Sequence, residues 1–108
     1  MMMRNTNETI FLSKKDVEYL LREVEFVLVS LVRLNNFYKE KLGQAFSIHD
    51  EYCEAVTEFI DAERVNDRLA KMRMVIASKF DDTLGDDDMD DLERVLDKIE
   101  FWERPKNV

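Results

Sequence analysis

The apolar residues between positions 17 and 42 recur every three or four residues, which is the spacing of one face of an α-helix. They are Val17, Leu20, Leu21, Val24, Val27, Leu28, Leu31, Tyr38 and Leu42. Ser13 followed by Asp16 resembles a capping box at the start of this helix. Gly43 suits its end, because glycine accepts the left-handed conformation. We therefore predict a long helix over 14–42.

A second apolar face lies in the middle of the same helix, at Phe26, Val29 and Val32. A helix that is apolar on two faces is contacted from two sides, so we expect it to be the central element of the domain. The β-branched residues also allow a strand over 26–32, but the helical spacing on both sides favours the helix.

Two shorter apolar stripes follow, and their phases do not match. The first comprises Tyr52, Val56, Phe59 and Ile60, and the second Val65, Leu69, Met72, Val75, Ile76 and Phe80. We predict two helices, over 48–62 and 67–80, that meet near Arg64-Val65-Asn66. One bent helix is the alternative.

A last apolar stripe predicts a final helix that stops before Pro105. Its residues are Leu92, Val95, Leu96, Ile99 and Trp102. With two glycines and one proline in 108 residues, the chain has too few turn residues for a β-sandwich. The sequence thus predicts an all-α fold, a compact bundle of about four helices with a long central N-terminal helix. The expected organisation is a flexible segment over 1–12, one helical domain over 13–104 and a tail over 105–108.

Cysteine usage and hydropathy bear on the compartment. Cys53 is the only cysteine, so this chain forms no internal disulfide. The densest apolar run, over 26–34, is half the length needed to cross a bilayer and contains Arg33. These features favour a cytoplasmic protein with no membrane partner.

Charge is distributed unevenly along a chain whose net charge is −8. Residues 44–67 carry seven acids and one base, and residues 68–80 carry four bases and no acid. Residues 81–103 carry eleven acids and two bases. The acidic charge therefore concentrates on the helix over 48–62 and around the last loop and helix.

Two groups of carboxylates are candidate binding surfaces. In the helix over 48–62, four acids step by three, four and three residues and so share one face, with Asp50 beside them. This set, the acidic ridge, consists of Glu51, Glu54, Glu58 and Asp61. The second set, the acidic loop, consists of Asp86, Asp87, Asp88, Asp90 and Asp91. The structural alternative is that the bases of 68–80 neutralise the ridge and that the loop is a solvated, well-capped helix start.

Metal and enzyme chemistry find little support in the sequence. A calcium loop counted from Asp82 places Leu84 at position three and Asp87 at position six, where an oxygen ligand and glycine are needed. His49 and Cys53 are one helical turn apart, but two ligands do not make a zinc site. No nucleophile elbow, glycine-rich phosphate loop or HExxH motif occurs. We therefore expect no enzymatic activity, no metal site and no cofactor.

The sign of the charge suggests the class of partner. An acidic chain is repelled by phosphate, which disfavours direct binding of nucleic acid, so the charge points to a basic protein. A nuclease active site is a positive cleft built for phosphate, and a carboxylate-lined helix can occupy it. We predict a cytosolic binding protein, most concretely an immunity or inhibitor protein that blocks a nuclease toxin. Tyr52 or Trp102 would supply the buried aromatic anchor.

Two alternatives use other features of the chain. The first is a helical homodimeric or adaptor module with a structural or regulatory role. Its interface would be the extra apolar face of the first helix, at Phe26, Val29, Val32 and Phe37. The second is a DNA mimic that inhibits a DNA-binding protein, which requires carboxylates spaced like phosphates over a long surface.

Overall fold

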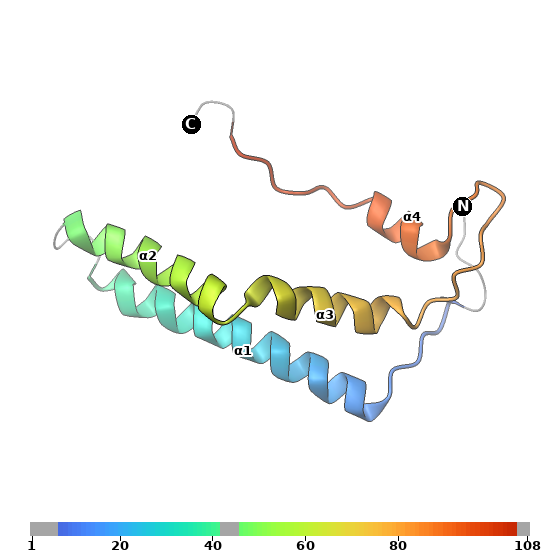
Figure 1. Ribbon diagram of the computed structural model, residues 1–108, viewed down its shortest axis with the longest axis horizontal. Coiled ribbons are helices and arrows are strands. Elements are labelled where there is room, and N and C mark those ends of the chain that lie inside the picture. Colours follow the sequence, from blue (N-terminus) through green and yellow to red (C-terminus); the bar gives the residue numbers. More distant parts are fainter. Residues whose placement is uncertain (1–6, 42–45, 106–108) are drawn as a thin grey trace. The chain divides into compact units, whose positions relative to one another are not determined.

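The computed structural model describes residues 7–41 and 46–105, and this part of the chain contains four helices and no strand. The helices are α1 (Lys14–Lys39), α2 (Phe46–Ala62), α3 (Val65–Ala77) and α4 (Asp91–Asp97), as Figure 1 shows. The predicted all-α class is confirmed. The alternative of a strand over 26–32 is wrong, because those residues lie inside α1.

The start of α1 follows from its cap. The Ser13 backbone is extended, and its hydroxyl accepts a hydrogen bond from the Asp16 N–H at 3.0 Å. This bond satisfies one of the free amides of the first turn. The helix continues through Asn35-Asn36 to Lys39. The helix ends there, with Glu40 as its C-cap, and is therefore shorter than the predicted 14–42. Leu42 and Gly43 themselves lie outside the described residues.

α2 and α3 are two helices rather than one bent helix. Glu63 and Arg64 separate them, and Arg64 has a left-handed φ of 54°. A residue in this conformation cannot continue a right-handed α-helix, which explains the phase slip between the two apolar stripes. The Arg64 Nε also donates a hydrogen bond to Asp67 Oδ2 at 3.0 Å in the first turn of α3.

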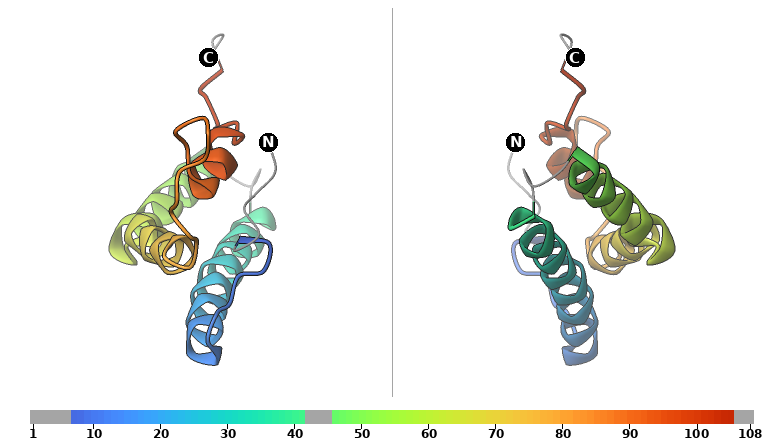
Figure 2. Two further views of the ribbon diagram at one scale, coloured as in Figure 1. Left: turned by 90° about the vertical axis from the view of Figure 1, so that its right-hand side faces the viewer. Right: turned by 90° about the vertical axis from the view of Figure 1, so that its left-hand side faces the viewer.

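The chain divides into two compact units. Leu12–Ile76 form one unit, and the residues up to Phe11 and from Ala77 on form the other. In the first unit, α2 runs alongside the C-terminal half of α1 (Figures 1 and 2). Aromatic pairs join these two helices. The ring centroids are 6.0 Å apart in Phe26–Phe59 and 5.7 Å apart in Tyr38–Tyr52.

The packed face of α1 differs from the one that the sequence suggested. Phe26 belongs to the face that meets α2 and α3, since its ring also lies 4.3 Å from the Arg68 guanidinium carbon. Phe26 is therefore partly covered within the chain, and its role in a dimer interface stays a prediction. None of the α1 residues is buried, whereas Val65 and Met72 of α3 are. Helical spacing alone reports that two faces are apolar but not which one the neighbouring helices cover.

The final helix is shorter than predicted. α4 ends at Asp97, so Ile99 and Trp102 lie beyond it, and 82% of Trp102 is exposed. The expectation of a helix reaching Trp102 is wrong. A short helix depends on the packing of its apolar face, and the exposed segment after Lys98 offers little of it. None of the helices described above has both the length and the apolar character to cross a membrane.

Candidate functional site

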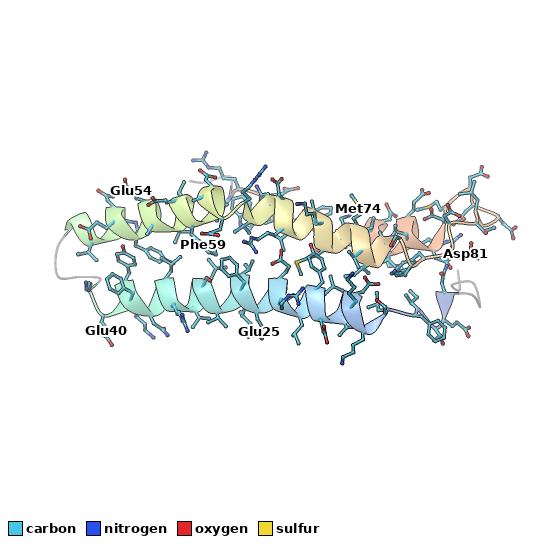
Figure 3. All side chains as sticks on the ribbon, turned by 60° about the horizontal axis from the view of Figure 1, so that its bottom comes forward. Glu25, Glu40, Glu54, Phe59, Met74 and Asp81 are labelled. Carbon is cyan, nitrogen blue, oxygen red and sulfur yellow. The ribbon has the colours of Figure 1, made fainter. Side chains whose placement is uncertain are left out.

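The acidic ridge lies on the exposed face of α2. Glu51, Glu54, Glu58 and Asp61 are all exposed, and so is Asp50 beside them. Figure 3 shows that Glu54 points away from α1, whereas Phe59 points toward it. The two orientations have one cause. Because Tyr52 and Phe59 pack against α1, the opposite side of the same helix must face solvent.

The basic residues of α3 do not pair with this ridge. Arg68 contacts Glu23 of α1, with 2.7 Å between Nη1 and Oε2, and approaches Glu63 at 3.6 Å. Arg64 pairs with Asp67. Within residues 7–41 and 46–105, no ion pair involves the ridge carboxylates or Asp50. The bases of α3 therefore form no ion pairs with the ridge among the described residues.

The candidate metal ligands next to the ridge contact one another only as a pair. His49 Nε2 lies 3.7 Å from Cys53 Sγ, one turn along α2. Across the described part of the chain, no group of three or more His, Cys, Asp or Glu side chains is arranged to hold a metal ion. This holds for the carboxylates of the acidic loop as well.

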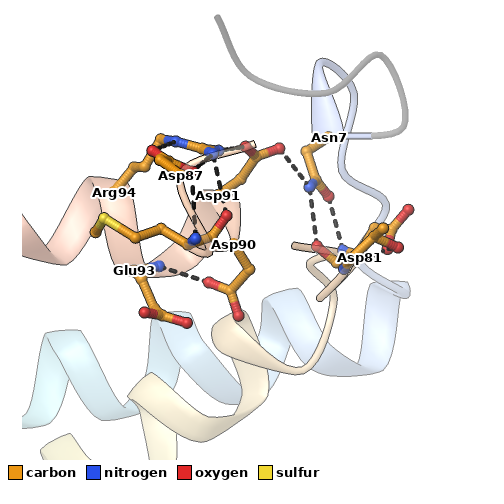
Figure 4. Close-up of polar contacts among 9 residues, drawn as sticks. Asn7, Asp81, Asp87, Asp90, Asp91, Glu93 and Arg94 are labelled. Atoms are coloured by element: carbon orange, nitrogen blue, oxygen red, sulfur yellow. Dashed lines mark hydrogen bonds and ion pairs between the residues drawn. The ribbon is translucent and has the colours of Figure 1, made fainter. Parts of the chain in front are cut away.

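Arg94 of α4 holds the acidic loop together (Figure 4). Its side chain is only 10% exposed. Nη1 lies 2.5 Å from Asp91 Oδ1, and Nη2 lies 2.5 Å from Asp87 Oδ1. Nη2 also donates to the Met89 carbonyl at 3.0 Å. The one guanidinium therefore forms ion pairs with two carboxylates and closes the loop.

Asn7 joins the N-terminal segment to this loop. Its side-chain amide donates to Asp91 Oδ2 at 2.8 Å and to the Asp81 carbonyl at 3.1 Å. In return, the Asp81 N–H donates to Asn7 Oδ1 at 2.8 Å. Asn7 is 4% exposed and Asp91 is fully buried, with 0% exposure. Sequence reasoning missed Asn7, because a lone asparagine within a segment expected to be flexible gives no signal of a partner 74 residues away.

The backbone of the loop is closed by its own hydrogen bonds. The Gly85 N–H donates to the Met89 carbonyl at 2.8 Å, and the Asp88 N–H donates to the Gly85 carbonyl at 3.2 Å. Asp88 takes a left-handed φ of 61°. A Cβ at Gly85 would collide with Arg94 Nη2, so a larger residue there would require the guanidinium to shift from its place beside Asp87.

The predicted residues of the acidic loop therefore fall into two groups. Asp87 and Asp91 bind Arg94, and Asp90 caps α4 by accepting a hydrogen bond from the Glu93 N–H at 2.7 Å. These three carboxylates serve the local fold. Asp86 and Asp88 are exposed. Asp91 can touch a partner only if the loop opens.

The pairing of Asp87 with Arg94 shifts both titrations. The hydrogen bond from Arg94 lowers the pKa of Asp87 below its ordinary value of 3.8, and burial opposes this shift in part. The same hydrogen bond raises the pKa of Arg94. Both groups are thus charged at neutral pH, where the loop is closed.

We expect the loop to loosen only in strong acid. Because the pKa of Asp87 is lower in the folded chain, its contribution to stability is present above 3.8 and is lost as the pH falls through the folded value. The NMR shift of the Met89 amide measures this, since that N–H donates to Asp87 Oδ1. In an Arg94→Gln variant the midpoint should rise toward 3.8. An equal midpoint in both proteins would contradict the assignment.

The two candidate aromatic anchors differ in exposure. Tyr52 is half-buried, with its ring edge against Tyr38 on α1. Trp102 is exposed and lies beyond the end of α4. Of the two, only Trp102 is presented to solvent as an anchor requires.

An open apolar hollow between α1 and α2 was not foreseen from the sequence. Its volume is about 610 Å³, and the rings of Phe26, Phe37, Tyr38 and Phe59 line it. Arg33 and Glu63 supply charged groups to its wall. The hollow lies on the α1 side of α2, so it belongs to a different face from the ridge.

Comparison of the chain with protein-family models, with curated proteins and with solved structures gave no match.

Proposed function

We propose that this protein is a cytosolic binding protein that captures a basic protein on the acidic ridge of α2. Its most concrete form is an inhibitor, or immunity protein, of a nuclease toxin. One observation carries the proposal: the ridge carboxylates are exposed and have no ion-pair partner in the described chain, although α3, which follows directly, contains three bases.

Unpaired like charges at this spacing work against the helix. Each pair destabilises it by about 0.2–0.5 kcal/mol. The four carboxylates extend over about 15 Å of helix, at 1.5 Å per residue. A cationic surface of that length relieves the repulsion on contact. It also speeds association toward about 10⁸ M⁻¹s⁻¹ at low salt.

The residues proposed to contact the partner lie in both units. In the first unit it consists of Asp50 and the acidic ridge. In the second it consists of Asp86, Asp88 and the exposed Trp102, because the other loop carboxylates bind within the fold. A DNA mimic would need a longer row of carboxylates, so the ridge favours a compact cationic site. The compact arrangement of four helices around α1 stays a prediction, and the proposal does not depend on it.

The test reverses two ridge charges. Glu54→Lys with Glu58→Lys is expected to weaken binding of the basic partner by about 10- to 100-fold, because attraction becomes repulsion. The matched control is Asp82→Lys with Asp97→Lys, which changes the net charge equally at two exposed positions outside α2. The immobilised chain is exposed to lysate of its source cell, and retained protein is eluted with rising salt.

Each eluted fraction is then assayed for nuclease activity with and without the purified chain. We expect a basic nuclease that elutes at high salt from the wild-type chain and from the control variant. The same nuclease should elute at lower salt from the ridge variant, and added wild-type chain should inhibit its activity. Equal retention on the ridge variant, or a retained partner without basic character, would refute the ridge as the binding surface.

A further inference from the structure

A row of aliphatic residues runs along the exposed side of α1. Its members are Val17, Leu21, Val24, Leu28 and Leu31, which are 47%, 57%, 44%, 53% and 38% exposed. The steps between them are four, three, four and three residues. This alternation is the heptad pattern of a coiled coil, in which Leu21 and Leu28 take a positions. We call this row the α1 seam.

The seam is not the face that packs against α2 and α3. Phe26 and Tyr38 contact rings of α2, and Glu23 binds Arg68 of α3. Leu28 follows Phe26 by two residues, which is about 200° around the helix. The neighbouring helices of the first unit therefore leave the seam to another partner.

The chemistry of the seam matches α1 itself. Five half-exposed aliphatic side chains present apolar surface on the order of 300 Å², comparable to the largest apolar patch of a typical monomer, and such patches are often functional. From Val17 to Leu31 the seam measures about 21 Å. A second α1 has both the length and the matching heptad spacing.

Asn35 indicates the register and the number of chains in a coiled coil formed through the seam. It stands four residues after Leu31, at the next a position, and it is exposed. A single asparagine at an a position typically fixes register and favours two strands, because each amide then faces its equivalent. In an antiparallel pair it would face apolar residues instead. Valine at the d positions 17 and 24 favours larger assemblies, but α2 and α3 occupy one face of α1 and leave room for one partner.

We propose that two copies of this chain associate in parallel through the α1 seam, with Asn35 facing Asn35. This proposal is independent of the acidic ridge, which lies on another helix. It also differs from the dimer face suggested by the sequence, since Phe26 is already used within the chain.

Sedimentation equilibrium of the full chain, from low to several hundred micromolar, tests the association. We expect a dimer that persists at high salt, with a dissociation constant in the micromolar range. Leu21→Glu with Leu28→Glu should raise that constant at least 100-fold. The seam is exposed in the single chain, so circular dichroism should show an unchanged helix content. Val29→Glu with Asn36→Glu adds the same charge on another part of α1 and should leave the dimer intact.

Crosslinking tests the parallel register. In a Cys53→Ser background, Asn35→Cys should form an intermolecular disulfide when oxidised glutathione is added, whereas Asn36→Cys should not. A chain that is monomeric at every concentration would overturn the proposal. So would a dimer that survives the seam variant, or a dimer that gives no crosslink through Asn35→Cys.

Discussion

Replacing Asp91 by alanine is expected to destabilise the acidic loop and its bond to the N-terminal segment by about 3–5 kcal/mol. Asp91 is fully buried, and its two carboxylate oxygens bind different partners, Asn7 at 2.8 Å and Arg94 at 2.5 Å. The alanine variant leaves the guanidinium and the amide without this acceptor. A buried polar group that loses its partner costs more than the bond itself contributed.

Hydrogen exchange at single amides measures this change. The Asp81 N–H is protected by Asn7, and the Gly85 N–H is protected by the Met89 carbonyl. Both should exchange about 100-fold faster or more in Asp91→Ala. Asp86→Ala removes an exposed carboxylate from the same loop and should change neither rate. Equal rates in the two variants would mean that Asp91 does not support the loop.

The second large effect concerns Arg68, which connects three helices. It binds Glu23 of α1, donates from Nε to the Glu63 carbonyl after α2 at 2.8 Å, and covers the Phe26 ring. Arg68→Met keeps the aliphatic stem but leaves Glu23, whose side chain is 18% exposed, without its cation. We expect the free energy of unfolding to fall by about 2–4 kcal/mol, somewhat less than for a fully buried pair.

Urea unfolding followed by circular dichroism measures this effect. Arg64→Met is the matched control, because the Arg64 side chain is 78% exposed and its ion pair is local. Adding Glu23→Gln to Arg68→Met removes the unpaired charge and should recover part of the loss. If Arg68→Met and Arg64→Met unfold at the same urea concentration, Arg68 does not join the helices.

Much of the fold could be predicted because helix formation is a local property. Ser13 supplies an N-cap from a position three residues before Asp16, and the apolar stripes report the helical period directly. The break between α2 and α3 also appears in the sequence as a phase slip. The length of α4 could not be predicted, since the stripe up to Trp102 describes a possible helix face and its stability depends on packing.

In the candidate sites, too, local spacing predicts some features and tertiary contacts decide the others. The acidic ridge is visible in the sequence, because a step of three or four residues places side chains on one helix face whatever surrounds it. Its charges remain unpaired in the structure, where Arg68 of α3 binds Glu23 of α1 instead. The acidic loop was misjudged as a uniform surface. Seven carboxylates within 81–91 look alike in the sequence, but one of them is buried and two bind Arg94.

The sequence by itself therefore determined the presence of four helices, a break near Arg64, the position of the ridge on α2 and the heptad spacing of the seam. Each of these depends on residues less than a few turns apart. Only the tertiary structure decided which face of α1 is covered, which carboxylates are free and what Asn7 does. These depend on contacts such as Asn7–Asp91, across 84 residues of chain. Local spacing carries no record of such contacts, because they form only when several helices compete for the same polar and apolar partners.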